Sequence, residues 1–242
     1  MAIHHSVEGT VASVTIDRTE RRNAINLEAL EGLDAAFTAT TDAGARCLVI
    51  SGAGGHFCAG ADLKELEDLA FTHRLRQVLD HLAGLDIPTI AAVSGACMGL
   101  GMQLALACDI RVAADDAYFG VPVAKLGLMV DHWTLRRLAA AVGIGTVRLM
   151  VLTAEILSSE DAWRVGLTQV RGGVDAAEVI AARVVELAPL SIAGSKLGLN
   201  LVERVVDDAT YDEAFRTAWG SEDLAEGQRA FAERRAPRFS GR

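Results

Sequence analysis

Two short segments made largely of small residues lie about 40 positions apart in the chain. They read His-Phe-Cys-Ala-Gly-Ala-Asp-Leu over 56–63 and Val-Ser-Gly-Ala-Cys-Met-Gly-Leu-Gly over 93–101. Each follows a short apolar run typical of a strand, and the second leads directly into a helical pattern. Backbone N–H groups at a helix start have no intrahelical acceptor, and the helix dipole favours negative charge there. Two such groups aimed at one point would form an oxyanion hole, which stabilises a thioester enolate.

The elements that would position these segments alternate between strand and helix. Hydrophobic spacing predicts strands over 10–17, 46–51, 89–93 and 109–113. It predicts helices over 26–42, 71–85, 100–107 and 131–142, another from Gly143, and an almost wholly helical chain from about 175 onward. Asn26 is a predicted N-cap, and Ser158 begins a capping pattern. This order predicts an α/β domain with a helical C-terminal section.

Composition and charge narrow the choice of partners. The 242 residues are 51% hydrophobic and 23% charged, enough for a large core in one domain or one domain plus a tail. The net charge is −9 and no basic run exceeds a pair, which disfavours nucleic acid and anionic membrane surfaces. Residues 87–108 carry no charge, but Pro88 and several glycines favour a buried strand, turn and helix over a membrane span.

Other chemistries lack their motifs in this sequence. There is no phosphate-binding GxxxxGK[ST] loop, no GxSxG nucleophile elbow and no HExxH metal pair, and the glycines after 93 do not have dinucleotide-binding spacing. The four cysteines, which show neither disulfide nor metal spacing, predict buried thiols in a cytoplasmic protein. The N-terminus has no signal-peptide layout. We therefore expect no metal.

Several ordered motifs together resemble the crotonase (enoyl-CoA hydratase/isomerase) superfamily over most of the chain. The motifs are Ile-Asp-Arg at 16–18 with Arg-Asn-Ala-Ile-Asn at 22–26, the two small-residue segments, Gln-Leu-Ala-Leu-Ala-Cys-Asp at 103–109, Phe-Gly-Val-Pro at 119–122, Gly127-Leu128 and the helix over 137–143. The amino-acid sequence at 125–128, 131–133 and 218–221 most resembles an actinobacterial branch of the superfamily that lacks both catalytic glutamates.

The resemblance implies a crotonase β-β-α spiral core over 1–190 and a helical C-terminal region over 191–242 that packs trimers, often paired into hexamers. The implied ligand is a fatty acyl-CoA thioester, so coenzyme A is part of the substrate and no separate cofactor is expected. Ala61 and Leu100 would be the oxyanion donors through their backbone N–H groups, and the Leu100 side chain would narrow the acyl channel. The implied substrate- and CoA-binding residues are Arg21, Arg22, Ala24, Ala59, Ala61, Asp62, Leu63, Lys64, Gly99 and Leu100.

The chain departs from the family at the two glutamate positions, which read Gln103 and Val123. Glutamine can hold a water molecule but cannot take its proton, and valine can do neither. Asp131 falls where some superfamily members place a catalytic aspartate, so it could move a proton. It also precedes an apolar helical pattern, where aspartate is a common N-cap, and both roles can hold at once.

Two kinds of function remain open from the sequence. The first is an enzyme of the hydratase/isomerase family in lipid metabolism, with Ala61 and Leu100 polarising the thioester and Asp131 doing the proton work. The second is a non-catalytic acyl-CoA-binding or carrier protein that kept the oxyanion donors and lost the chemistry. Classical two-glutamate hydration is doubtful under either hypothesis, because each general acid–base group contributes on the order of 10²–10⁴-fold.

Overall fold

The structure is a computed structural model, and it describes residues 2–62, 69–202, 216–217 and 219–238. Six strands form the main sheet, in the order β1 (Ile3–Glu8), β2 (Val11–Ile16), β3 (Cys47–Gly52), β4 (Thr89–Val93), β6 (Ile110–Ala113) and β9 (Val170–Arg171). Strands β1 and β2 form an antiparallel pair with Ile3 opposite Ile16, and the other neighbours run parallel. Parallel neighbours need crossover connections, which the helices supply.

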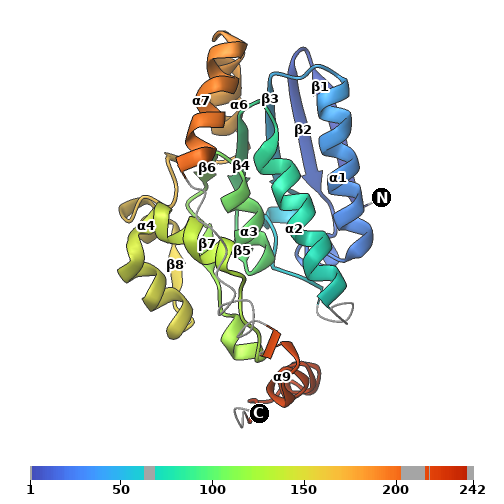
Figure 1. Cartoon of the computed structure of the whole chain (residues 1–242), viewed down its shortest axis with the longest axis vertical. Coiled ribbons are helices and arrows are strands. Elements are labelled where there is room, and N and C mark those ends of the chain that lie inside the picture. Colours follow the sequence, from blue (N-terminus) through green and yellow to red (C-terminus); the bar gives the residue numbers. More distant parts are fainter. Residues whose placement is uncertain (1, 63–68, 203–215, 218, 239–242) are drawn as a thin grey trace.

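The main sheet is covered on both faces, as Figure 1 shows. Alternate residues of a strand point to opposite faces. In β3, Leu48 and Ile50 belong to the larger core with helices α1 (Leu27–Asp42) and α2 (Leu69–Gly84). Cys47 and Val49 instead pack with α6 (Val174–Val184) on the other face. The central strands therefore read as continuous apolar runs.

A smaller sheet lies beside the main one and carries the second small-residue segment. It has the order β5 (Ala96–Met98), β7 (Tyr118–Gly120) and β8 (Ile156–Ser158). Helix α3 (Leu100–Ala107) starts directly after β5, and its residues are almost entirely buried. The chain from β4 through β5 into α3 is thus a strand, turn and helix inside the core. Among the described residues, no helix is both long and apolar enough to cross a membrane.

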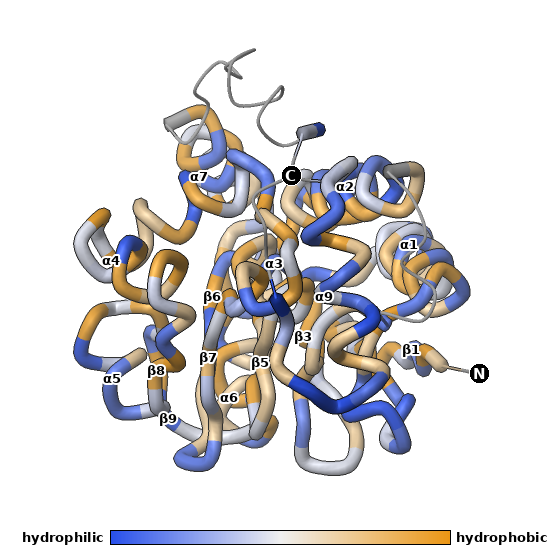
Figure 2. The backbone as a smooth tube through the Cα atoms, turned by 90° about the horizontal axis from the view of Figure 1, so that it is seen from below, coloured by the Kyte–Doolittle hydropathy of each residue, from blue (hydrophilic) through white to orange (hydrophobic). Residues whose placement is uncertain are grey.

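The remaining helices close the ends of the fold. They are α4 (His132–Leu152), α5 (Ser159–Arg164), α7 (Pro189–Val202) and α9 (Glu222–Glu233), with short 3-10 turns η1 (Thr19–Arg21), η2 (Ala53–Gly55) and η3 (Val123–Leu126). Helix α4 bends at Gly143, whose φ of 76° and ψ of 150° are not helical. Figure 2 shows hydrophobic stretches along α7 and α4 as well as in the interior.

The predicted α/β class and the main alternation of elements are confirmed. The side chain of Asn26 accepts a hydrogen bond from the Ala29 N–H, and Ser158 accepts one from Asp161, as N-caps do. The bend at Gly143 separates the two helices predicted there. The prediction missed β1 and four strands of two or three residues: β5, β7, β8 and β9. A division between 1–190 and 191–242 stays a prediction.

Candidate functional site

Backbone hydrogen bonds hold the two small-residue segments side by side. The Cys58 N–H donates to Ala96 O at 2.8 Å, and the Met98 N–H donates to Cys58 O at 3.0 Å. Each segment then turns at a glycine with positive φ, Gly60 at 125° and Gly99 at 52°. Such backbone conformations are costly for residues with a Cβ. The next residue in each case, Ala61 or Leu100, is a predicted donor. The positive φ of the preceding glycine therefore sets the direction of each of these two backbone N–H groups.

The Ala61 and Leu100 amides are held in place without an internal acceptor. The carbonyl of the Gly60–Ala61 peptide accepts the Ile25 N–H at 2.9 Å, which fixes that peptide group. Leu100 is the first residue of α3, where an N–H has no partner within the helix. No described residue accepts a hydrogen bond from either N–H. Both amides are therefore available to a ligand.

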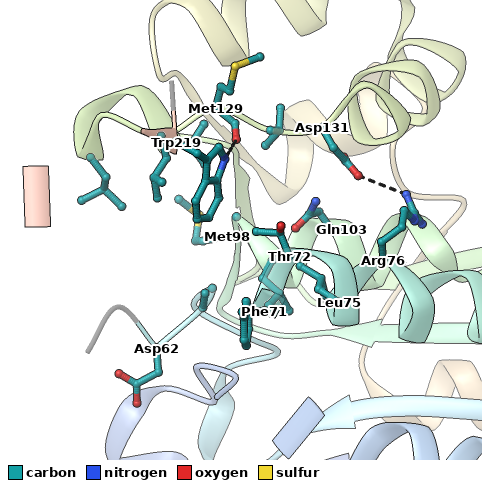
Figure 3. A pocket seen from close by; sticks show the side chains of 18 of the residues that line it. Asp62, Phe71, Thr72, Leu75, Arg76, Met98, Gln103, Met129, Asp131 and Trp219 are labelled. Atoms are coloured by element: carbon teal, nitrogen blue, oxygen red, sulfur yellow. Dashed lines mark hydrogen bonds and ion pairs between the residues drawn. The ribbon is translucent and has the colours of Figure 1, made fainter. Parts of the chain in front are cut away.

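Both residues line one cavity of about 720 Å³ (Figure 3). Apolar side chains make up much of its wall, among them Phe71, Leu75 and Leu79 from α2 and Met98 beside the second donor. Leu100 itself lines the cavity and is only 5% exposed. An apolar cavity with a few polar groups is the usual form of a small-molecule site.

A chain of hydrogen bonds runs from Gln103 to the start of α4. Gln103 Nε2 donates to Thr134 Oγ1 at 2.8 Å, and the Thr134 hydroxyl donates to Asp131 Oδ1. The Thr134 backbone N–H also donates to Asp131 Oδ1, at 3.0 Å. Asp131 is thus the N-cap of α4, which confirms one of its two predicted roles. Gln103, the first member of this chain of hydrogen bonds, also lines the cavity.

The second Asp131 oxygen meets Arg76 of α2. Arg76 Nη1 lies 3.3 Å from Asp131 Oδ2, and Nη2 lies 3.1 Å from Asp80 Oδ1 on the same helix. The Arg76 guanidinium carbon is 3.7 Å from the centre of the Trp133 ring, within cation–π range. Burial lowers the pKa of Arg76, and the two aspartates oppose that effect. Both oxygens of Asp131 are therefore engaged.

The predicted CoA-binding residues fall into three groups. Residues that line the cavity are Arg21, Ala24, Ala59, Ala61, Asp62, Gly99 and Leu100. Arg22 is exposed and does not line it, although its carbonyl accepts the Ala59 N–H. Leu63 and Lys64 lie outside the described residues. Asp62 is held by Arg18, whose Nη2 lies 3.2 Å from Oδ2.

Val123 lies in the wall of the same cavity, at the start of η3. The two positions expected to carry glutamates in the family, Gln103 and Val123, thus line one space. An amide and an aliphatic side chain there supply no group that ionises near neutral pH. Among the described residues, no group of three His, Cys, Asp or Glu side chains could hold a metal ion.

Three further contributors were missed in the sequence. Arg76 and Thr134 complete the polar chain, and Trp219 closes the cavity from the C-terminal region, where Nε1 donates to Met129 O at 3.4 Å. The i,i+4 spacing of Arg76 and Asp80 was visible as a helix pair. Nothing in the spacing indicated that Arg76 would meet Asp131, because that contact joins residues far apart in the chain.

Comparison with known proteins agrees with this geometry. The family model for enoyl-CoA hydratase/isomerase matches residues 6–242. The chain belongs to this family. It is 39% identical over 234 residues to a probable enoyl-CoA hydratase, echA6, of Mycobacterium tuberculosis, covering 96% of both chains. It is 34% identical to a probable enoyl-CoA hydratase of Bacillus subtilis, covering 99% of each.

Solved structures confirm the crotonase fold. An enoyl-CoA hydratase from Mycobacterium avium subsp. paratuberculosis is 30% identical, with a TM-score of 0.85 over 99% of both chains. A methylmalonyl-CoA decarboxylase in complex with 2-nitronate-propionyl-CoA superposes with a TM-score of 0.92 at 24% identity, over 100% of this chain and 99% of that one. The mycobacterial relatives agree with the predicted actinobacterial branch of the enoyl-CoA hydratase/isomerase family.

Proposed function

We propose that this protein binds a fatty acyl-CoA thioester in lipid metabolism, with the carbonyl oxygen between the N–H groups of Ala61 and Leu100. The observation that carries the proposal is a pair of backbone donors, without acceptors among the described residues, on two residues that line one largely apolar cavity. A thioester oxygen supplies the missing acceptor, and the cavity wall accommodates the acyl chain.

The coenzyme A part of the ligand enters beside η1. Arg21 lines the cavity there, and the exposed Arg22 adjoins it. Guanidinium groups bind phosphates through charge-assisted hydrogen bonds. Ala24 and Ala59 also line the cavity, and Arg18 holds this part of the wall by donating to the Ala24 carbonyl and pairing with Asp62. The coenzyme arrives with the ligand, so the proposal needs no separate cofactor.

The proposal excludes efficient two-glutamate hydration. Water addition needs a base for the water and a proton at the α-carbon, and neither Gln103 nor Val123 can exchange a proton at neutral pH. The two oxyanion donors remain, each worth on the order of 10²–10³-fold in rate when a full mechanism is present. Isomerisation of the acyl group is the catalytic alternative that we propose, with Asp131 as the proton carrier.

A non-catalytic acyl-CoA carrier is the second candidate. It is favoured by the state of Asp131, whose two oxygens are bound by Thr134 and Arg76. To exchange a proton with a ligand, Asp131 would have to give up one of these contacts. Binding and polarising the thioester would then be the whole function. We place either function in the cytoplasm, where the four buried free cysteines stay reduced.

We further propose that the protein assembles as a trimer or a pair of trimers. Large apolar side chains remain exposed on α4 and α7, including Leu152 at 77% and Leu190 at 88%. Exposed apolar surfaces of this kind commonly mark contacts between subunits. Light scattering after a sizing column tests this proposal, and a stable monomer would contradict it.

The experiment that tests the proposed function measures acyl-CoA binding and turnover on the same preparation. Binding of saturated acyl-CoA is followed by calorimetry, and hydration of short and long trans-2-enoyl-CoA is followed at high protein concentration. We expect binding with little or no hydration. Fast hydration would contradict the exclusion of that reaction, and failure of every acyl-CoA to bind would contradict the proposal itself.

A further inference from the structure

The Arg76–Asp131 pair lies at the end of the cavity away from the predicted coenzyme entrance. Figure 3 places Asp62 at one end and the Arg76–Asp131 contact at the other, with Gln103 and Leu75 between them. A ligand whose thioester sits at Ala61 and Leu100 directs its acyl chain past Gln103 toward this pair. Acyl chains of increasing length would therefore approach the Arg76–Asp131 pair.

Arg76 separates the cavity from solvent. On the inner side it reaches Asp131 across 3.3 Å and covers the Trp133 ring at 3.7 Å. On the outer side it pairs with Asp80, whose side chain is 60% exposed. The Arg76 and Asp131 side chains are themselves only 25% and 30% exposed. The guanidinium thus bridges α2 and the start of α4 as a thin wall.

This wall is polar on a cavity that is otherwise largely apolar. An acyl chain gains binding free energy with each methylene that leaves water, about fourfold in affinity per methylene. A methylene pressed against a guanidinium that keeps two carboxylate partners gains nothing further, because the charged groups would lose hydrogen bonds. The gain should stop where the chain reaches Arg76.

We propose that the Arg76–Asp131 pair is the end wall of the acyl cavity and sets the longest acyl chain that binds, which makes Arg76 a specificity-determining residue. This inference rests on the proposed function, since it assumes that the cavity holds the acyl group. It names the ligand property that the site measures, namely chain length from the oxyanion donors to the guanidinium.

The test measures dissociation constants for saturated acyl-CoAs of about 4 to 18 carbons, a series in which each added methylene should strengthen binding until the wall is met. In the unmodified protein we expect affinity to rise with length and then level off. In Arg76→Ala the levelling should move to longer chains by several carbons, while the affinities of short chains stay within about twofold. Arg76→Met, whose flexible apolar side chain can move aside, is the second variant and should show the same shift.

The matched control is Arg74→Ala. Arg74 lies on the same helix and also binds two carboxylates, Glu31 and Asp34, but it does not line the cavity. It should keep the length profile of the unmodified protein. An Arg76 variant that is folded by thermal unfolding and levels off at the unmodified length would overturn the inference, as would an unmodified profile that never levels off. If no acyl-CoA binds more tightly than free coenzyme A, the proposed function itself fails.

Discussion

Gln103 Nε2 lies 2.8 Å from Thr134 Oγ1, and this contact fixes the direction in which the Gln103 amide faces. The Thr134 hydroxyl has one proton, and it donates that proton to Asp131 Oδ1. The Thr134 oxygen must then accept a hydrogen bond from Gln103, so the NH₂ group of the Gln103 amide faces Thr134. The Gln103 carbonyl oxygen is left toward the cavity, as Figure 3 shows. Gln103 therefore offers the cavity a hydrogen-bond acceptor, where a glutamate would offer a base.

Thr134→Val tests this orientation, because valine keeps the shape of threonine and removes the hydroxyl. Gln103 Nε2 loses its acceptor and Asp131 Oδ1 loses the hydroxyl donor, while Asp131 keeps the backbone N–H of residue 134. We expect a loss of about 2 kcal/mol in the free energy of unfolding, the typical net value of two hydrogen bonds. Urea unfolding measures it. Thr153→Val removes an exposed hydroxyl at the other end of α4 and should cost clearly less.

Asp131→Asn and Asp131→Ala separate capping from proton transfer. Asparagine caps helices about as well as aspartate, whereas alanine costs about 1 kcal/mol of unfolding free energy. Asparagine keeps the cap but removes the negative charge that pairs with Arg76, so we expect a slightly lower melting temperature for Asn and a clearly lower one for Ala. If Asp131 carries protons, any isomerase turnover disappears in both variants while acyl-CoA binding persists. Equal turnover in the Asn variant would show that Asp131 acts only as a cap.

Leu100→Pro removes the second proposed donor without a change of element. Leu100 is the first residue of α3, where proline is well tolerated because that N–H has no helical acceptor. Leu100→Ala is the matched control, since it also shortens the side chain but retains the N–H. We expect acyl-CoA to bind the proline variant about 3- to 10-fold more weakly than the alanine variant, the value of one net hydrogen bond. Equal affinities would remove Leu100 from the oxyanion hole.

The order of the main elements could be predicted because strong local patterns determined them. Apolar runs, N-caps such as Asn26 and the helix start at Leu100 all depend on residues within a few positions of one another. Strands β5, β7 and β8 were missed because a run of three residues carries almost no periodic signal.

The candidate site likewise has parts that depend on short continuous segments and parts that depend on contacts between distant residues. Ala61 and Leu100 were predicted as donors because they lie in two short continuous segments that resemble motifs of the family. The Arg76–Asp131 pair joins residues 55 positions apart, and only the packing of α2 against the start of α4 brings them together. A lone arginine on an amphipathic helix gives no sign of such a partner, so the end wall of the cavity could be recognised only in the structure.

Glu226 of helix α9 binds Arg229 on the same helix and the residues that follow the helix, and these contacts should be sensitive to acid. Hydrogen bonds from Arg235, then Arg229 and the Arg238 backbone N–H, hold the pKa of Glu226 far below its usual value. A lowered pKa in the folded state stabilises the fold above the pKa of the unfolded chain, and this contribution is lost as the pH falls below it. Glu226→Gln should therefore destabilise the protein at neutral pH. The difference from the unmodified protein should shrink as the pH falls below about 4.5, the ordinary Glu value.

Urea unfolding of both proteins across that pH range measures the effect. Glu233→Gln is the matched control, because Glu233 lies on the same helix, is half exposed and, within the part of the chain that the structure describes, pairs only with Arg235. It should cause a much smaller loss. The result also bears on the site, since Phe231 of α9 lines the cavity and a loosened helix would weaken acyl-CoA binding in parallel. A Glu226→Gln variant whose stability deficit is the same at neutral and acid pH would contradict the role of the ionised carboxylate.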